Sequence, residues 1–170
     1  MKETLQVKFK KLREDAVIPT YAKPGDAGMD ITAVDVEYDL QNDRYIYHTG
    51  LEFEVPEGYY MDLRPRSSNT KTDVYMPNAP GTLDSGYRGE LLVVFKNRDK
   101  LPITPYLTLS HDQNTVINAY ANTISALAPY KIGERVCQMI ILPYPKIELV
   151  EVTELSETER GDGGFGHTGK

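Results

Sequence analysis

The chain has no tryptophan and a single cysteine, Cys137, among its 170 residues. One cysteine cannot form an internal disulfide, so we expect a protein that works in a reducing compartment. No apolar run approaches the roughly 18 to 20 residues of a membrane-spanning helix, and the N-terminal residues lack the apolar core of a signal peptide. The sequence therefore predicts a soluble, cytoplasmic protein with no membrane partner.

The chain also lacks an excess of positive charge. Its 25 acidic residues outnumber its 19 basic residues, and the net charge is −6. This balance disfavours binding to a polyphosphate backbone, so we expect no nucleic-acid partner. Any phosphate group that the protein binds should be small and held locally. Histidine and cysteine do not cluster at zinc-site spacing, and no partner for His48 or His111 is evident from the sequence.

Short apolar segments, separated by many of the 11 prolines and 13 glycines, indicate a β-rich protein. The expected strands are Leu5–Phe9, Leu51–Val55, Tyr59–Leu63, Leu91–Phe95, Val136–Leu142 and Ile147–Val152. Because helices do not alternate with these strands, we predict an all-β jelly roll or distorted β-barrel rather than a parallel α/β sheet. The length suits a single domain over residues 1–170.

Residues 99–130 form a long connection that we interpret as an insertion between neighbouring strands. Within it, Val116, Tyr120, Ile124 and Leu127 recur at helical spacing, which predicts a short amphipathic helix between Asp112 and Leu127. Long ordered insertions often carry function. The two interpretations are a lid packed on the barrel and a contact surface for a regulatory protein.

The last eleven residues, Arg160–Lys170, contain five glycines, one arginine and one phenylalanine besides the terminal lysine. Such a segment loses much entropy on ordering and buries little by itself, yet its N–H groups can wrap a polyphosphate. Arg160 would add a planar fork for phosphate, and Phe165 a flat face for a base. We interpret residues 160–170 as a mobile closing arm; the alternative is a frayed terminus.

Five short blocks resemble, in order and approximate spacing, those of the trimeric deoxyuridine triphosphatase (dUTPase) family. They are Ala27–Ile31, Pro65–Ser68, Gly81–Gly89, Arg135–Gln138 and Arg160–Gly169. The resemblance covers nearly the whole chain outside residues 99–130. It implies a dUTPase-like fold and a dUTP diphosphatase that converts dUTP to dUMP and pyrophosphate. That reaction keeps uracil out of DNA and supplies dUMP for thymidylate synthesis. A homotrimer with shared active sites is implied as well.

The resemblance also implies roles for three residues that would otherwise be read as turn or core residues. Asp84 would hold the attacking water and act as general base towards the α-phosphorus, whereas an isolated Asp beside Ser and Gly is usually a turn former. The Tyr87 ring would pack under the deoxyribose and collide with a 2′-hydroxyl. Asn78 and its hairpin would pair with the uracil edge and leave groups unpaired against cytosine.

Further substrate contacts are implied at Arg66, Ser67, Ser68, Gly81, Thr82, Gln138, Arg160, Phe165, Gly166, His167 and Thr168. Asp30 would contact Mg²⁺ through water, because a triphosphate needs a cation and can supply most of its ligands. Arg135 is expected to be structural, and Arg64 to balance Asp62. His167 departs from the serine that is common in the family, which affects the detailed contacts of the arm.

Two alternatives to a dUTPase follow from the same features. A deoxycytidine triphosphate deaminase would share the fold but would lack the glycine-rich arm with its phenylalanine. A protein-binding module would use residues 99–130, since staphylococcal phage members of the family carry insertions there and act on repressors. A phage-encoded protein would be placed in the host cytoplasm.

Overall fold

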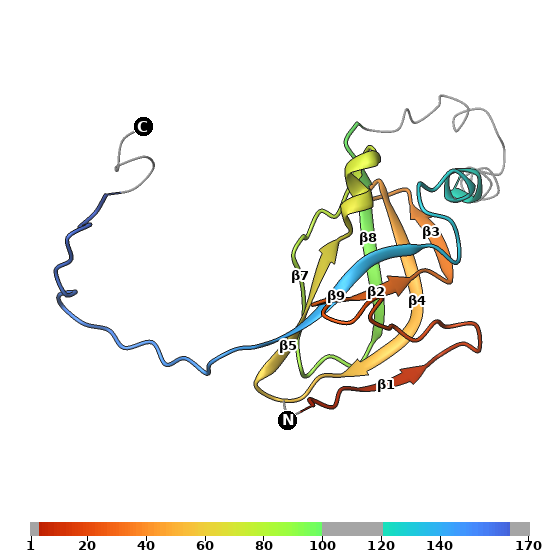
Figure 1. The fold of residues 1–170 in the computed structure, drawn as a ribbon. Helices are drawn as coiled ribbons and strands as arrows, with labels where there is room; N and C mark the ends of the chain where they lie inside the picture. The colour runs from red at the N-terminus through yellow and green to blue at the C-terminus, as the bar shows by residue number, and fades with distance from the viewer. Residues whose placement is uncertain (1–3, 100–120, 164–170) are drawn as a thin grey trace.

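The computed structural model describes residues 4–99 and 121–163, which form two antiparallel sheets (Figure 1). The first sheet runs in the order β1 (Lys8–Lys11), β4 (Arg44–Glu54), β8 (Glu90–Asn97) and β6 (Val74–Tyr75), with β3 (Asp35–Asp39) also paired to β4. The second runs in the order β2 (Met29–Thr32), β9 (Arg135–Pro143), β5 (Tyr59–Pro65) and β7 (Gly81–Leu83). A 3-10 turn, η1 (Ser67–Lys71), follows β5. The all-β prediction is confirmed, although no strand pairing closes the two sheets into a barrel within the described ranges.

The core lies between the sheets because alternate residues of each strand point inwards. Tyr47 on β4 is fully buried, and its ring packs edge-on against Phe95 of β8 and against Tyr130. The Tyr130 backbone N–H donates to the Tyr47 hydroxyl at 3.1 Å. The C-terminal end of residues 99–130 is therefore anchored in the core.

Most of the predicted strands are found, and the exceptions have physical causes. The segments Leu51–Val55, Tyr59–Leu63, Leu91–Phe95 and Val136–Leu142 lie largely within β4, β5, β8 and β9. The predicted strand Leu5–Phe9 is displaced, since pairing with β4 begins at Lys8 and Phe9 is exposed.

The predicted strand Ile147–Val152 is wrong for this chain. After β9 the backbone runs away from both sheets without pairing to either (Figure 1). Its apolar residues face solvent, and Leu149 is 90% exposed. A strand needs a neighbour to satisfy its backbone groups, and no described residue of the chain lies alongside this segment as one.

The predicted helix is observed in part. Residues 121–126 are helical and Ile124 is buried, but Leu127 is 68% exposed, contrary to the expected apolar face. Ala128 takes the buried position instead. Val116 and Tyr120 lie outside the described residues. Within the described ranges, helices are too short to cross a membrane.

Candidate active site

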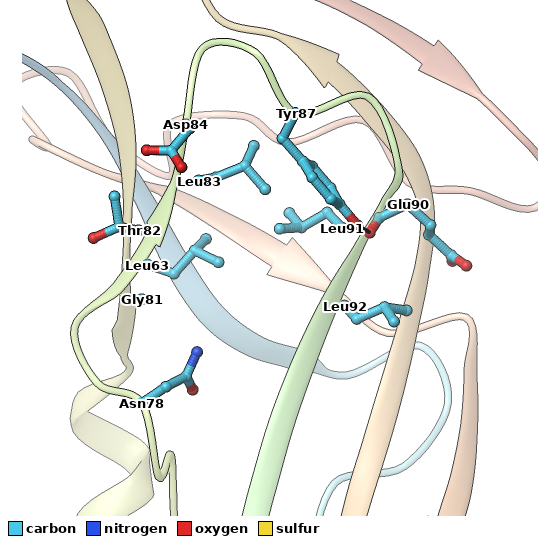
Figure 2. A pocket seen from close by; sticks show the side chains of 10 residues that line it. All are labelled: Leu63, Asn78, Gly81, Thr82, Leu83, Asp84, Tyr87, Glu90, Leu91 and Leu92. Atoms are coloured by element: carbon cyan, nitrogen blue, oxygen red, sulfur yellow. Dashed lines mark hydrogen bonds between the residues drawn. The ribbon is translucent and has the colours of Figure 1, made fainter.

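A pocket of about 220 Å³ lies where β7 ends opposite the start of β8 (Figure 2). Its lining combines leucine side chains with a few polar groups, which is the usual character of a small-molecule site. The lining residues are Leu63, Asn78, Gly81, Thr82, Leu83, Asp84, Tyr87, Glu90, Leu91 and Leu92. Five predicted site residues, Asn78, Gly81, Thr82, Asp84 and Tyr87, are thus brought to one hollow.

Strand alternation positions the polar groups of this pocket. Leu83, the last residue of β7, points into the core, so the next residue, Asp84, is exposed at the rim. A turn follows, in which the Tyr87 N–H donates to the Asp84 carbonyl at 3.1 Å. The hydroxyl of Tyr87 donates to the Glu90 carbonyl at 3.1 Å, so the ring stands at the pocket wall opposite Leu83 (Figure 2).

Gly81 keeps the floor of the pocket open. A β-carbon at this position would lie 3.3 Å from the Leu63 β-carbon and 3.4 Å from Asn78 Nδ2. The first distance is tighter than most contacts of a β-carbon and the second is at the edge of ordinary contact, so a side chain here would require Leu63 to shift by a few tenths of an ångström.

A second group of predicted residues surrounds Asp30 on the other sheet edge. Arg66 Nε donates to Asp30 Oδ1 at 2.8 Å, and Arg135 Nη1 donates to Asp30 Oδ2 at 3.0 Å. Arg66 Nη1 also reaches Ser68 Oγ at 3.3 Å. The Asp30 side chain is only 11% exposed, and it pairs with the largely shielded Arg66 and with Arg135, which is 53% exposed.

Gln138 on β9 lies opposite Asp30 of β2 on one side and opposite Arg64 of β5 on the other. Arg64 donates to the buried carboxylate of Asp62 at 2.7 Å, which agrees with the balancing role expected for it. Ser67 is exposed at the start of η1. Gln138, Arg66, Ser68 and Asp30 therefore lie together, Ser67 is next to them in sequence, and none of the five lines the Asp84 pocket.

Cys137 is unsuited to nucleophilic chemistry. It is fully buried, and burial, reinforced by nearby Asp30, raises the pKa of its thiol to about 12. Since the thiolate is the reactive form, Cys137 is a core residue. The site's chemistry belongs to its oxygen and nitrogen groups.

The residues present can contact a hydrated cation but cannot enclose one. Within residues 4–99 and 121–163 no cluster of three or more His, Cys, Asp or Glu side chains could hold a metal. Asp30 uses one acceptor position on each oxygen for an arginine, and each oxygen retains a further lone pair. The donor set thus fits Mg²⁺ that a substrate's phosphates and water hold, with Asp30 accepting from a bound water.

The arm is described only at its start. Arg160 is exposed and its Nε donates to the Gly163 carbonyl at 2.9 Å, closing a local turn. Phe165, Gly166, His167 and Thr168 lie outside the described residues, and so does His111. Arg160 does not line the Asp84 pocket of its own chain.

Sequence reasoning missed Glu90 and assigned no partner to His48. Glu90 directly follows the block Gly81–Gly89 and lines the pocket. His48 Nδ1 lies 3.0 Å from Glu90 Oε2. The two residues are 42 positions apart in the chain, so only the pairing of β4 with β8 brings them together. Adjacency to the matched block was the one signal that could have drawn attention to Glu90.

Comparison with known proteins relates the chain to one family. The family model described as dUTPase matches residues 14–105 and 103–169. The deoxyuridine 5′-triphosphate nucleotidohydrolase of Hydrogenobaculum sp. (strain Y04AAS1) is 39% identical over 167 residues, covering 97% of this chain and 99% of the relative. The enzyme of the same name from Fusobacterium nucleatum is 38% identical over 169 residues, covering 97% and 99%.

Solved structures of the same family are also similar to this chain. A mutant dUTPase of Staphylococcus bacteriophage 80alpha with dUpNHpp has a TM-score of 0.71 and 26% identity, with 98% of this chain and 100% of that chain covered. A mutant dUTPase of phage phi11 of S. aureus, described with a structural Mg(II) ion, has a TM-score of 0.65 at 23% identity, covering 90% and 100%; at that identity it shows the fold alone. The resemblance predicted from the five blocks is confirmed, and the chain belongs to the dUTPase family.

Proposed function

We propose that this chain hydrolyses dUTP to dUMP and pyrophosphate, with Asp84 as the general base that activates the attacking water. The supporting observation is the pocket that gathers Asn78, Asp84 and Tyr87 around one hollow of nucleoside size. Asp84 is the carboxylate at its rim, unpaired with any cation among the described residues. A free, hydrated carboxylate is suited to accept a proton from water.

Recognition of the base and sugar would divide between the two walls of the pocket. Asn78 and the backbone up to Gly81 would pair with the uracil edge, and Thr82 would lie beside them. The Tyr87 ring would face the deoxyribose and leave no room for a 2′-hydroxyl. A cytosine amino group would leave the same polar groups unpaired, at a cost of roughly 1 to 3 kcal/mol each.

The triphosphate would be bound by the group around Asp30, with Arg66, Ser67, Ser68 and Gln138 as donors. The Asp30 carboxylate orients Arg66 at 2.8 Å, so the guanidinium is fixed before substrate arrives. Bound Mg²⁺ would neutralise charge on the phosphate oxygens. Arg160, Phe165, Gly166, His167 and Thr168 would close over the nucleotide and exclude water.

We further propose a homotrimer in which one subunit contributes the Asp84 pocket and another contributes the phosphate-binding residues around Asp30. Within one chain the residues around Asp30 do not line the Asp84 pocket, and the described segment after β9 leads away from both sheets (Figure 1). The exposed apolar segment Ile147–Val152 lacks a partner strand among the described residues. An apolar hollow of about 520 Å³, lined in part by Phe53, Met139 and Ile141, is available to receive apolar residues of another copy.

A regulatory protein is a second candidate partner, with residues 99–130 as its contact. Leu127 and Ile132, at the C-terminal base of this region, are both exposed. Phage 80alpha dUTPase, 27% identical with a TM-score of 0.70, is described as controlling transfer of virulence genes. Such binding would accompany catalysis rather than replace it, because the sequence contains all five of the matched blocks.

Hydrolysis in oxygen-18 water tests the site of attack. Attack at the α-phosphorus forms the new P–O bond on dUMP and expels pyrophosphate, so mass spectrometry should find the label in dUMP alone. Label in pyrophosphate would place the attack at the β-phosphorus and contradict the assignment of Asp84.

A further inference from the structure

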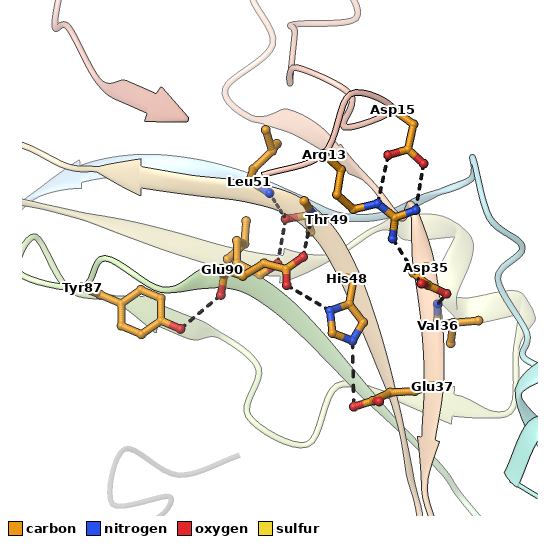
Figure 3. Close-up of polar contacts among 12 residues, drawn as sticks. Arg13, Asp15, Asp35, Val36, Glu37, His48, Thr49, Leu51, Tyr87 and Glu90 are labelled. Atoms are coloured by element: carbon orange, nitrogen blue, oxygen red, sulfur yellow. Dashed lines mark hydrogen bonds and ion pairs between the residues drawn. The ribbon is translucent and has the colours of Figure 1, made fainter. Parts of the chain in front are cut away.

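Glu90, the first residue of β8, lies at the junction of the pocket and the first sheet. Its backbone carbonyl accepts the Tyr87 hydroxyl, while its carboxylate points the other way, towards β4 (Figure 3). The side chain is 23% exposed, and both of its oxygens have partners. Neither the proposed general base, Asp84, nor the proposed phosphate-binding residues around Asp30 use these contacts of Glu90.

The carboxylate of Glu90 accepts a hydrogen bond from a bulge in β4. His48 pairs with Leu92 and Glu52 with Glu90, so β4 has two more residues than β8 over this stretch. The extra length bulges at Gly50, whose φ is +66°. Its N–H donates to Glu90 Oε1 at 2.7 Å, and His48 Nδ1 lies 3.0 Å from Oε2. A bulge leaves backbone groups without ladder partners, and here one carboxylate supplies an acceptor.

The Tyr87 ring is held at its hydroxyl by the first residue of β8. It is 43% exposed, so little core packing restrains it. Its hydroxyl donates to the Glu90 carbonyl at 3.1 Å. A β-carbon at Gly89 would lie 2.4 Å from the hydroxyl oxygen, so the ring occupies space that exists because residue 89 lacks a side chain.

We propose that Glu90 is a positioning residue for sugar selection. By tying the start of β8 to the bulge of β4, it fixes the carbonyl that holds Tyr87. The ring then stays at the distance that admits a deoxyribose and excludes a ribose. This inference rests on the proposed role of Tyr87 as the sugar filter, because a ring that does not meet the sugar needs no such anchor.

The test compares kcat/KM for dUTP and UTP in variants of the full chain, with thermal melting as a second readout. Glu90→Ala removes the tie, and we expect the dUTP preference to fall by at least about tenfold, the scale of one lost charged hydrogen bond. Glu90→Gln should keep the preference within about threefold, because its amide oxygen can still accept from Gly50. Glu54→Ala is the matched control: this exposed Glu in the same sheet pairs with Lys8, and its removal should change nothing.

Two variants of Tyr87 separate the positioning role of Glu90 from the sugar selection by the Tyr87 ring. Tyr87→Phe keeps the ring but loses the hydroxyl bond, so we expect it to lose preference as Glu90→Ala does, even if Glu90→Ala fails to fold. Tyr87→Ala should abolish the preference. If Tyr87→Ala loses the preference for dUTP while Tyr87→Phe and Glu90→Ala both keep it, the positioning role of Glu90 is refuted. The proposed role of Tyr87 in excluding the ribose is then unaffected. Comparable hydrolysis of UTP by the unaltered chain would instead refute the filter itself.

Discussion

Arg66 and Asp30, 36 residues apart in sequence, are joined by a 2.8 Å bond from the arginine Nε to the carboxylate. Arg135 occupies the other oxygen. We therefore expect the Asp30 carboxylate to position Arg66 in addition to making the proposed water-mediated contact with Mg²⁺. A guanidinium that points at phosphate without its counter-charge must be reoriented by each substrate, which costs rate.

Asp30→Asn should therefore lower kcat/KM for dUTP by about tenfold or more, as expected for loss of a charge-assisted bond. Raising the Mg²⁺ concentration should restore only part of this loss, because Arg66 stays unanchored. Steady-state kinetics over a Mg²⁺ titration measures both effects. Asp15→Asn, which breaks an exposed ion pair with Arg13, is the control; equal kinetics for the two variants would refute the role of Asp30.

Asp84→Asn should separate chemistry from binding. The amide cannot accept the proton of the attacking water, so turnover should fall by about a hundredfold to ten-thousandfold, the range of general base catalysis. Affinity for the non-hydrolysable analogue dUpNHpp, measured by calorimetry, should stay within a few fold. Substitution of exposed Asp73 by Asn should alter neither quantity. Normal turnover in Asp84→Asn would remove this residue from the mechanism.

The exposed segment after β9 predicts an oligomer. Light scattering on the pure protein should give three times the 19.2 kDa chain mass. Charged residues in place of Leu149 and Val150 should lower that mass and the activity together, since both side chains are largely exposed in the single chain and burying a charge is costly. Glu148→Gln should preserve the assembly. A fully active monomer would contradict the shared site.

Removal of residues 160–170 should abolish most turnover while leaving the melting temperature nearly unchanged. The described start of the arm hydrogen-bonds only locally, through Arg160 and Gly163 or Thr158 and Gly161, so we expect the fold not to depend on it. Phe165→Ala should weaken dUpNHpp binding by about 1 to 3 kcal/mol, the range for a base stacked on an aromatic ring. Normal catalysis after truncation would identify the arm as a frayed terminus, and a much earlier melt would make it structural.

Local patterns predicted what depends on local chemistry. Alternation over Leu51–Val55 and the aromatic run Tyr59–Leu63 indicated strands that the structure contains. The same rules gave a strand at Ile147–Val152, where the pattern is present but no strand among the described residues pairs with it. Strand formation depends on long-range pairing, which short segments do not encode.

At the site, too, local features could be predicted from the sequence and long-range contacts could not. The matched blocks named Asp84 and Tyr87 as candidate site residues, because turn residues in a fixed order can be matched from the sequence alone. The contact between His48 and Glu90 depends on the register of β4 against β8 and on a bulge at Gly50. Neither register nor bulge could be read from the sequence, so the support behind Tyr87 emerged only in three dimensions.

The most direct measurement is a nucleotide panel with product analysis, in which the purified protein and Mg²⁺ are given dUTP, dTTP, dCTP and UTP separately. We predict that dUTP yields dUMP and pyrophosphate in equal amounts, and that the other three react at least about a hundredfold more slowly, since two poorly satisfied contacts suffice for that ratio. Ammonia released from dCTP, orthophosphate released from dUTP, or no hydrolysis of dUTP would contradict the proposed function.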